Sequence, residues 1–540
     1  MRAAAGPADA GRASWPRFID ALADVSVLAV FFVVASKLLV SIFNRSVGGM
    51  DDVSHFLNVV KIAQSGCRWN DILLLYNDVN FTPYHLQLHY PPVAYLSSFV
   101  VCASGVDFRV GVAVANLIWM FLGYVSIAAS LRLIFKDGLA PLVASTLTGA
   151  VLLSFVMGFF LHDPGWRMAA FGAVASSIWL FLKLVEHEDV FWRWLAAGLM
   201  LGAALLIHLL AFLAAGIALV VLVFGLAELR KQAFGRGKLV WVILGVAAVA
   251  SLFYLPLVGH GAGEFGRELQ SEGLVMPGKV AVEFSNLLAN YSKFLRMAPV
   301  PQPVSPAVLL SFAAVVVALI LGGGVVRALS VAYILSHAIL LVGRTPGNQS
   351  YLVPIVPLWL VCVSCGVCVA ARKVRAFLVL PVALAVAFAH IATVASPAED
   401  VGNGTDWEVD LMSAAIAPYD GLYQDEFCVV DCASSDPYVY RDKLAWAVAI
   451  RRPGESMRLM PFGHNSVLRG EPVGQVRWKF LKSLTDRRCG LLVVFVPRRS
   501  RECSIADMWE FKVLLQGYRP ARRYKLARAW MEIYERKRAQ

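Results

Sequence analysis

Long apolar runs separated by short polar loops make up most of this chain. A helix needs about twenty apolar residues to cross a bilayer, and many of these runs reach that length. We therefore predict about eleven membrane-spanning helices, each ending where polar residues return. The predicted spans are residues 23–43, 110–131, 139–160, 165–185, 194–208, 210–228, 239–257, 307–326, 328–343, 351–371 and 376–395.

The pattern changes after Ser396, where charged and apolar residues begin to alternate. Short apolar runs at 427–430 and 491–496 are typical of buried strands, and the stretch from Arg519 to Arg538 is strongly basic. We predict an all-α polytopic membrane domain over 1–396 and a small α/β domain outside the membrane over 397–540. The basic stretch either packs on that domain or lies against anionic headgroups or an acidic glycan.

Composition supports a membrane protein and excludes a single soluble core. Of the 540 residues, 58% are hydrophobic and only 16% are charged, and the mean hydropathy is +0.65. The formal net charge of +12 does not indicate nucleic-acid binding, because the basic residues form short clusters between apolar spans. With a cytoplasmic N-terminus, every such cluster falls in a cytoplasmic loop. The clusters are Arg132/Lys136, Lys183/Arg193, Arg230/Lys231/Arg236/Lys238, Arg327 and Arg372/Lys373/Arg375.

This topology leaves a first outer loop at 44–109, a middle outer loop at 258–305, and the segment 397–540 on the outer face. The apolar segment from Pro91 to Ser104 is too short to span, so we expect a helix that lies on or dips into the outer surface. Cys67 and Cys102 fall in the first outer loop, where disulfides are permitted if that side is oxidising. Short loops and frequent alanine and arginine suggest a bacterial inner membrane protein.

Two adjacent carboxylates, Asp51 and Asp52, stand where the first outer loop leaves the membrane. They begin an amphipathic helix, because apolar residues recur at helical spacing from Val53 to Ala63. One interpretation is that the carboxylates only cap this helix. Capping needs a single carboxylate, however, and paired charges at a membrane edge are costly to keep, which favours a chemical role.

Further motifs follow the acidic pair in a fixed order. They are a helix ending at Gly66 with Trp69 close behind, then Tyr90-Pro91-Pro92-Val93-Ala94-Tyr95, Leu161-His162-Asp163-Pro164, and Arg344-Thr345-Pro346-Gly347-Asn348-Gln349-Ser350-Tyr351-Leu352-Val353-Pro354. This order, over roughly residues 20–370, resembles the GT-C superfamily of polyprenyl-phosphate-sugar glycosyltransferases. The chain is similar to its lipid A aminoarabinose transferase and protein O-mannosyltransferase branch, and to the actinobacterial mannosyl- and arabinofuranosyltransferases.

The chain departs from the superfamily pattern in two places. Asp52 stands where many relatives have Glu, and Tyr90 replaces a His or Lys before the double proline, although His89 lies just upstream. His208 occupies a position where some relatives have Lys. A lone histidine on an apolar helix is also common as a packing residue, so His208 has two interpretations.

The resemblance implies a transferase that moves a hexose or pentose from a polyprenyl-phosphate donor to a lipid, glycan or protein acceptor at the outer face. It implies an inverting displacement in which a carboxylate deprotonates the acceptor and cations neutralise the departing phosphate. The catalytic candidates are Asp51 as the base, Asp52 and Asp163. The substrate-binding candidates are His55, His89, Tyr90, Arg109, His162, His208, Arg344 and Tyr351.

No cofactor is required by the sequence, and membrane lipids are the other expected partners. A divalent cation held by Asp51 and Asp163 is compatible with the variation among relatives, but no metal-ligand spacing demands one. The rival functions are a transporter or flippase of lipid-linked sugars and a non-catalytic membrane scaffold. A transporter would be expected to show repeat symmetry and charges near the membrane midplane, whereas the acidic residues here gather at the outer interface.

Overall fold

The protein is represented by a computed structural model in which contacts divide the chain into two compact units. The first comprises Met1–Asn44 and Gln87–Ala398, and the second comprises Arg45–Leu86 and Glu399–Gln540. Part of the predicted first outer loop therefore groups with the C-terminal segment. The residues that the structure describes are 21, 24–29, 31–33, 35, 36, 59, 62, 63, 66–70, 92–105, 108–152, 157, 165–186, 190–271, 306–343, 349–373, 406–419, 427–431, 440, 443, 444, 447, 490–498, 509–526 and 529–537.

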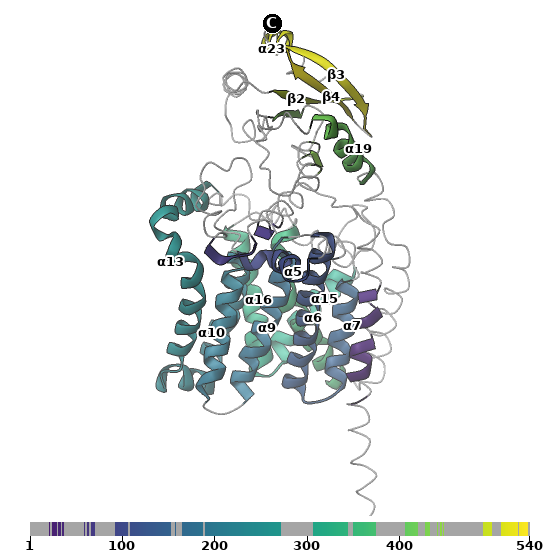
Figure 1. The fold of residues 1–540 in the computed structure, drawn as a ribbon. Coiled ribbons are helices and arrows are strands. Elements are labelled where there is room, and N and C mark those ends of the chain that lie inside the picture. Colours follow the sequence, from purple (N-terminus) through teal and green to yellow (C-terminus); the bar gives the residue numbers. More distant parts are fainter. Residues whose placement is uncertain are drawn as a thin grey trace, which may run out of the picture. The chain divides into compact units, whose positions relative to one another are not determined.

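The first unit is a bundle of helices standing side by side (Figure 1). Every span predicted between residues 110 and 371 has a described helix, whereas the span predicted at 376–395 lies outside the described residues. The elements are η1 (Pro92–Tyr95), α5 (Leu96–Ser104), α6 (Phe108–Phe135), α7 (Leu139–Leu152), α9 (Arg167–Glu186), α10 (Phe191–Leu205), α11 (Leu209–Gly225), α12 (Ala227–Arg230), the π-helical turn η2 (Lys231–Gly235), α13 (Leu239–Ser271), α15 (Pro306–Leu321), α16 (Gly324–Gly343), η4 (Gln349–Leu352) and α17 (Val356–Lys373).

Three stretches in the described part of the chain are long and apolar enough to cross a membrane: Val110–Phe135, Arg167–Val185 and Leu239–Pro256. The pair Leu209–Gly225 and Ala227–Gly235, bent by 100°, adds a fourth if it counts as one span. Large apolar side chains also face outward, such as Leu310, which is 71% exposed. These features make the chain an integral membrane protein, while the total of about eleven spans stays a prediction.

Two helices show how the predicted boundaries compare with the structure. α5 has 9 residues, so it is a short helix as predicted, and its location at the membrane surface stays a prediction. α13 continues past the predicted end at 257 to Ser271, into the segment expected as the middle outer loop. Within α13 the apolar stretch long enough to cross a membrane is Leu239–Pro256, which agrees with the predicted span at 239–257, and Pro256 does not end the helix.

α6 and α9 pack closely and run in the same direction. Gly172 in α9 lies against Trp119 in α6, and further along both helices the hydroxyls of Ser126 and Ser176 are 3.1 Å apart. A Cβ added at Gly172 would lie 2.6 Å from the Trp119 backbone oxygen, so a larger residue would push the helices apart. The parallel packing places the N-termini of both helices at one end of the bundle.

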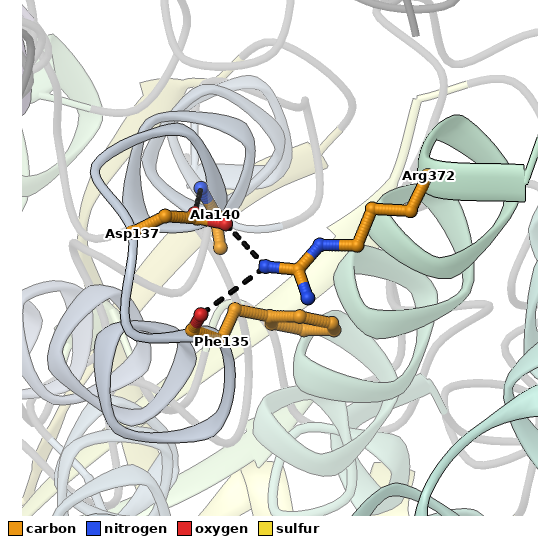
Figure 2. A network of polar contacts seen from close by, with 4 residues as sticks. All are labelled: Phe135, Asp137, Ala140 and Arg372. Atoms are coloured by element: carbon orange, nitrogen blue, oxygen red, sulfur yellow. Dashed lines mark hydrogen bonds and ion pairs between the residues drawn. The ribbon is translucent and has the colours of Figure 1, made fainter. Parts of the chain in front are cut away.

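The C-terminal ends of α6 and α17 meet at the opposite end (Figure 2). Arg372 donates from Nη2 to the backbone oxygen of Phe135 at 3.1 Å and to the Asp137 carboxylate, and its guanidinium lies 4.8 Å from the Phe135 ring centroid. The second Asp137 oxygen accepts the Ala140 N–H at 3.0 Å in the first turn of α7. One carboxylate thus joins α17 to the turn between α6 and α7.

Helix directions bring the basic clusters to this same end, which we call the basic end. Arg193 at the start of α10 donates to the backbone oxygen of Lys183 at the end of α9, at 3.4 Å. α16 begins beside the end of α11, because Gly324 contacts Leu226. The described basic clusters here are Arg132/Lys136, Lys183/Arg193, Arg230/Lys231/Arg236/Lys238, Arg327 and Arg372. Their cytoplasmic location stays a prediction.

The second unit contains a four-stranded sheet in the order β1-β2-β4-β3. β1 (Phe427–Asp431) runs parallel to β2 (Leu491–Pro497), and β4 (Ala529–Arg536) pairs antiparallel with both β2 and β3 (Tyr518–Lys525). The strands predicted at 427–430 and 491–496 are confirmed. The basic stretch that begins at Arg519 supplies β3 and β4, so it is an integral part of the sheet.

The core of the second unit forms around β2, which is buried from Leu491 to Phe495. The Tyr440 ring stacks on Phe495 with centroids 5.4 Å apart. Glu408 in α19 (Asp406–Ile416) forms a buried ion pair with Lys443. The remaining described elements are η5 (Ala417–Tyr419) and α23 (Trp509–Gln516).

Five cysteines in the described part of the chain fall into two chemical groups. Cys67 and Cys102, both from the predicted first outer loop, are disulfide-bonded. Cys362, Cys365 and Cys368 are free and buried in α17. Disulfides persist in oxidising compartments, which is consistent with an outer location for the first loop.

The close approach of α15 and α17 predicts a difference between two glycines. A Cβ at Gly366 in α17 would lie 1.9 Å from the backbone oxygen of Ala314, whereas nothing lies within 4 Å of one at Gly216 in α11. We expect Gly366→Ala to lower the free energy of unfolding by about 1–3 kcal/mol. Gly216→Ala should be neutral or stabilise by up to about 1 kcal/mol. Thermal unfolding of the purified variants in detergent measures both, and equal stabilities would contradict the close packing.

Candidate functional site

The N-termini of α6, α9 and α11 form the end of the bundle opposite the basic end, and we call it the site end. α6 and α9 begin there because they run parallel, and α11 begins beside α9, where Trp166 and His208 stack. α5 packs against the start of α6, since Ser97 and Val101 both contact Gly111. Helix N-termini carry unpaired N–H groups and the positive end of the helix dipole, so this end favours an anion.

His208 joins the start of α11 to the start of α9. Its ring stacks on Trp166 with centroids 3.8 Å apart and an angle of 15° between the planes. Its Nδ1 accepts the Leu210 N–H at 3.1 Å, so the side chain is the N-cap of α11. Because Nδ1 accepts this bond, that ring nitrogen carries no proton in this arrangement. His208 is only 3% exposed, which makes it a positioning group in the described structure.

Arg167 is a buried cation at the same end. It is the first residue of α9 and is 4% exposed, with its guanidinium carbon 6.0 Å from the Trp166 ring centroid. Burying a guanidinium among apolar helices is costly, and the helix dipole at an N-terminus adds to that cost for a cation.

Two other residues predicted from the sequence fall within described elements. Arg109 is the second residue of α6, so its backbone lies at the site end. Tyr351 is half-buried in η4, directly before α17. Because α17 is about 27 Å long and ends at the basic end near Arg372, its start and Tyr351 lie toward the site end. The remaining candidates lie outside the described residues: Asp51, Asp52, His55, His89, Tyr90, His162, Asp163 and Arg344.

Sequence reasoning did not identify Trp166, Arg167 or His337. Arg167 carried a usable signal, since it is an ionisable residue near the start of an apolar span, three residues after Pro164. His337 is buried in α16, where its ring meets Tyr333 edge-on at 4.6 Å. Trp166 carried no signal of this kind, because its stacking on His208 joins two parts of the chain that are distant in sequence.

Metal ligands do not gather within the part of the chain that the structure describes. No group of three or more His, Cys, Asp or Glu side chains that could hold an ion occurs there. The two carboxylates expected as ligands, Asp51 and Asp163, lie outside it.

Comparison with solved structures identifies the fold. No family model and no curated protein matches the sequence. The structure of ArnT from Cupriavidus metallidurans bound to undecaprenyl phosphate aligns with a TM-score of 0.58 and 14% identity, over 95% of this chain and 97% of that chain. The archaeal oligosaccharyltransferase AglB from Archaeoglobus fulgidus, in complex with an inhibitory peptide and a dolichol-phosphate, aligns with a TM-score of 0.54 and 14% identity, over 94% and 74%.

Both proteins belong to the GT-C superfamily, so this chain has the GT-C fold. The superfamily resemblance deduced from the order of the sequence motifs is confirmed at the level of fold. The alignment with ArnT extends over nearly the whole of both chains, so it includes the C-terminal unit as well as the helical bundle.

Two substitutions of His208 separate its contributions at the site end. His208→Ala removes both the cap and the stacked ring, and we expect it to lower the free energy of unfolding by about 1–3 kcal/mol. His208→Asn keeps a capping acceptor and loses only the ring, so its loss should be about 0.5–1.5 kcal/mol. Unfolding in detergent measures both. Wild-type stability for the two variants would show that the contact between α9 and α11 does not depend on His208.

Proposed function

We propose that this protein is a glycosyltransferase that uses a polyprenyl-phosphate sugar as its donor. The observation that carries the proposal is the site end of a GT-C fold, where the N-termini of three helices lie at the same end of the bundle as the buried Arg167. That arrangement favours a phosphate anion. Lipid phosphates are bound in the solved structures of ArnT and AglB, which have the same fold.

A lipid-linked donor suits a site at the end of an apolar bundle. The polyprenyl chain would lie along the outward-facing apolar side chains, and its phosphate would reach the polar helix ends. We propose that Arg109 and Arg344 contact the donor phosphate, because Arg109 opens α6 and Arg344 directly follows the last residue of α16. Further proposed contacts with the donor are His55, His89, Tyr90, His162 and Tyr351. His208 stacks on Trp166 and so keeps the starts of α9 and α11 together.

The proposed reaction is a single displacement at the anomeric carbon. Asp51 accepts the proton of the acceptor hydroxyl while the oxygen of that hydroxyl forms a bond to the anomeric carbon. The bond to the phosphate oxygen breaks, and the polyprenyl phosphate leaves with the electron pair while arginines neutralise its charge. Attack from the face opposite the leaving group inverts the anomeric configuration. Asp52 and Asp163 would orient these groups, and Asp163 stands three residues before Trp166 in sequence.

A divalent cation would fit the proposed chemistry without being required by it. The candidate ligands, Asp51 and Asp163, offer carboxylate oxygens, which suit hard cations. Such an ion would help to neutralise the leaving phosphate. Arg109 and Arg344 would still orient the donor, and Asp51 would still need a free oxygen to accept the proton.

The proposed location of the reaction is the outer face of a bacterial inner membrane, with the N-terminus in the cytoplasm. The gathering of the basic clusters at the other end supports this orientation, because basic loops are retained in the cytoplasm. The disulfide-bonded Cys67 and Cys102 support an oxidising environment for the first loop. The acceptor would be a lipid, a glycan or a protein on that face.

Replacing the proposed base tests the function directly. Asp51→Asn keeps the shape of the side chain and removes its basicity, so single-turnover transfer from a polyprenyl-phosphate sugar should slow by about 10²–10⁴-fold. Asp410→Asn, an exposed position in α19, is the matched control and should transfer at the wild-type rate. Near wild-type transfer by Asp51→Asn would remove it as the base and transfer the role to Asp52 or Asp163. Full activity after all three changes would contradict the proposed mechanism.

A further inference from the structure

The chain turns sharply where α11 ends, at the basic end of the bundle. Leu209–Gly225 and Ala227–Gly235 are bent by 100° relative to each other, so α12 and η2 run across the end of α11 instead of continuing it. η2 is a π-helical turn, a rare form that is frequently found at functional sites. We call residues 227–238 the bent segment. It contains four basic residues and a single acidic one, Glu228.

The bent segment has one face toward the protein and one face away from it. The buried side chains are Leu229, Gln232 and Ala233, and the exposed ones next to them are Arg230, Lys231 and Phe234. This spacing places two cations and an aromatic ring together on the outward face. In the part of the chain that the structure describes, neither cation is within ion-pair distance of a carboxylate.

An apolar strip on α11 leads to these cations. Val220 and Phe224 are 53% and 58% exposed and lie one turn apart, and the partly exposed Leu213 and Ile217 extend the same face of the helix. The Phe224 ring lies against the Phe234 ring of the bent segment, with centroids 5.6 Å apart. From Leu213 to Phe224 the strip is about 17 Å long. One leaflet of the hydrocarbon core is about 15 Å thick, so the strip matches one acyl chain.

Arg327 adds a third cation near the bend. It is exposed in the first turn of α16, and its Nε donates to the backbone oxygen of Gly322 at 2.8 Å. The next residue, Ala328, lies 3.5 Å from where a Cβ at Gly225 would stand, at the last residue of α11. Two neighbouring helices therefore contribute positive charge where the strip ends.

We propose that the bent segment and the strip bind one anionic phospholipid of the leaflet at the basic end. The acyl chain lies along the strip, and the phosphate accepts hydrogen bonds from Arg230 and Lys231 next to the end of the strip. The ligand is a lipid and not a soluble anion, because exposed apolar side chains adjoin the cations. It is an anionic lipid, because its charge complements cations that no described carboxylate neutralises.

Cations at the basic end have a second explanation, since basic loops are the ones retained in the cytoplasm. That role depends on the number of charges and not on the apolar side chains beside them, so it predicts no bound lipid. Arg132 and Lys136, after the same bundle end is reached by α6, provide the comparison. They are the same two residue types, but Arg132 pairs with Asp24 at 2.8 Å.

Native mass spectrometry of the full-length protein tests the proposal, after copurified lipid has been removed in a neutral detergent. Titration with phosphatidylglycerol measures each binding event, and phosphatidylcholine with the same acyl chains is the reference without net charge. We expect one phosphatidylglycerol to bind more tightly than phosphatidylcholine. Arg230→Gln/Lys231→Gln should weaken that event about tenfold or more. Phe224→Ala/Phe234→Ala should weaken the binding of both lipids, because it shortens the strip.

Two variants serve as controls and should bind phosphatidylglycerol like the wild type. Arg132→Gln/Lys136→Gln removes the same charges elsewhere at the basic end, and Arg230→Lys/Lys231→Arg keeps both charges in the bent segment. Equal losses from the two glutamine variants would reduce the effect to net charge and overturn the proposal. Equal wild-type affinities for the two lipids, or unchanged binding by Phe224→Ala/Phe234→Ala, would overturn it too. So would displacement of the lipid by equimolar glycerol 3-phosphate, because the ligand would then be a soluble anion.

Discussion

Close parallel packing between α6 and α9 sets the arrangement on which the functional site depends. Gly172 lets α9 approach the backbone of α6 at Trp119, and the two helices then stay in register as far as the Ser126 and Ser176 hydroxyls. Parallel helices have their N-termini together, so Arg109 and Arg167 start from the same end of the bundle. The stacking of Trp166 on His208 brings the start of α11 to that end too.

The two ends of the bundle differ in character as a consequence of these directions. The basic end collects lysines and arginines, and Arg372 is anchored there to Asp137 and Phe135. In the part of the chain that the structure describes, the site end collects helix N-termini and the buried Arg167. The first distribution is the one that orients a membrane protein, and the second suits a phosphate at the membrane surface. Orientation and chemistry thus depend on the same packing.

The sequence predicted the elements more successfully than their contacts. Hydrophobic length identified α6, α9 and α11, and alternation of apolar residues identified β1 and β2, because both signals are local. The continuation of α13 to Ser271, beyond the predicted span, was not predicted, because hydropathy marks the apolar stretch Leu239–Pro256 and not the end of the helix. The basic stretch after Arg519 could not be recognised as β3 and β4, since the pairing of β4 with β2 joins residues far apart in the chain.

The candidate site was also predictable only where its signals are local in the sequence. Arg109, His208 and Tyr351 could be named from the sequence, and the helix directions bring them toward one end. The role of His208 could not be predicted, because its cap on Leu210 is local but its stacking partner, Trp166, belongs to another helix. Arg167 was overlooked although it is ionisable and opens a span, so the rule that charges in membrane segments mark function applied here as well.

The proposed function requires that the site end binds the phosphate of a polyprenyl lipid. Photo-crosslinking with a polyprenyl phosphate that carries a diazirine in the isoprene unit next to the phosphate tests it most directly, with the attachment sites mapped by mass spectrometry. We expect attachment in peptides that contain Arg109, Trp166 or His208, and loss of that attachment when unlabelled polyprenyl phosphate competes. Attachment concentrated near Asp137 and Arg372, or attachment that unlabelled lipid does not displace, would contradict it.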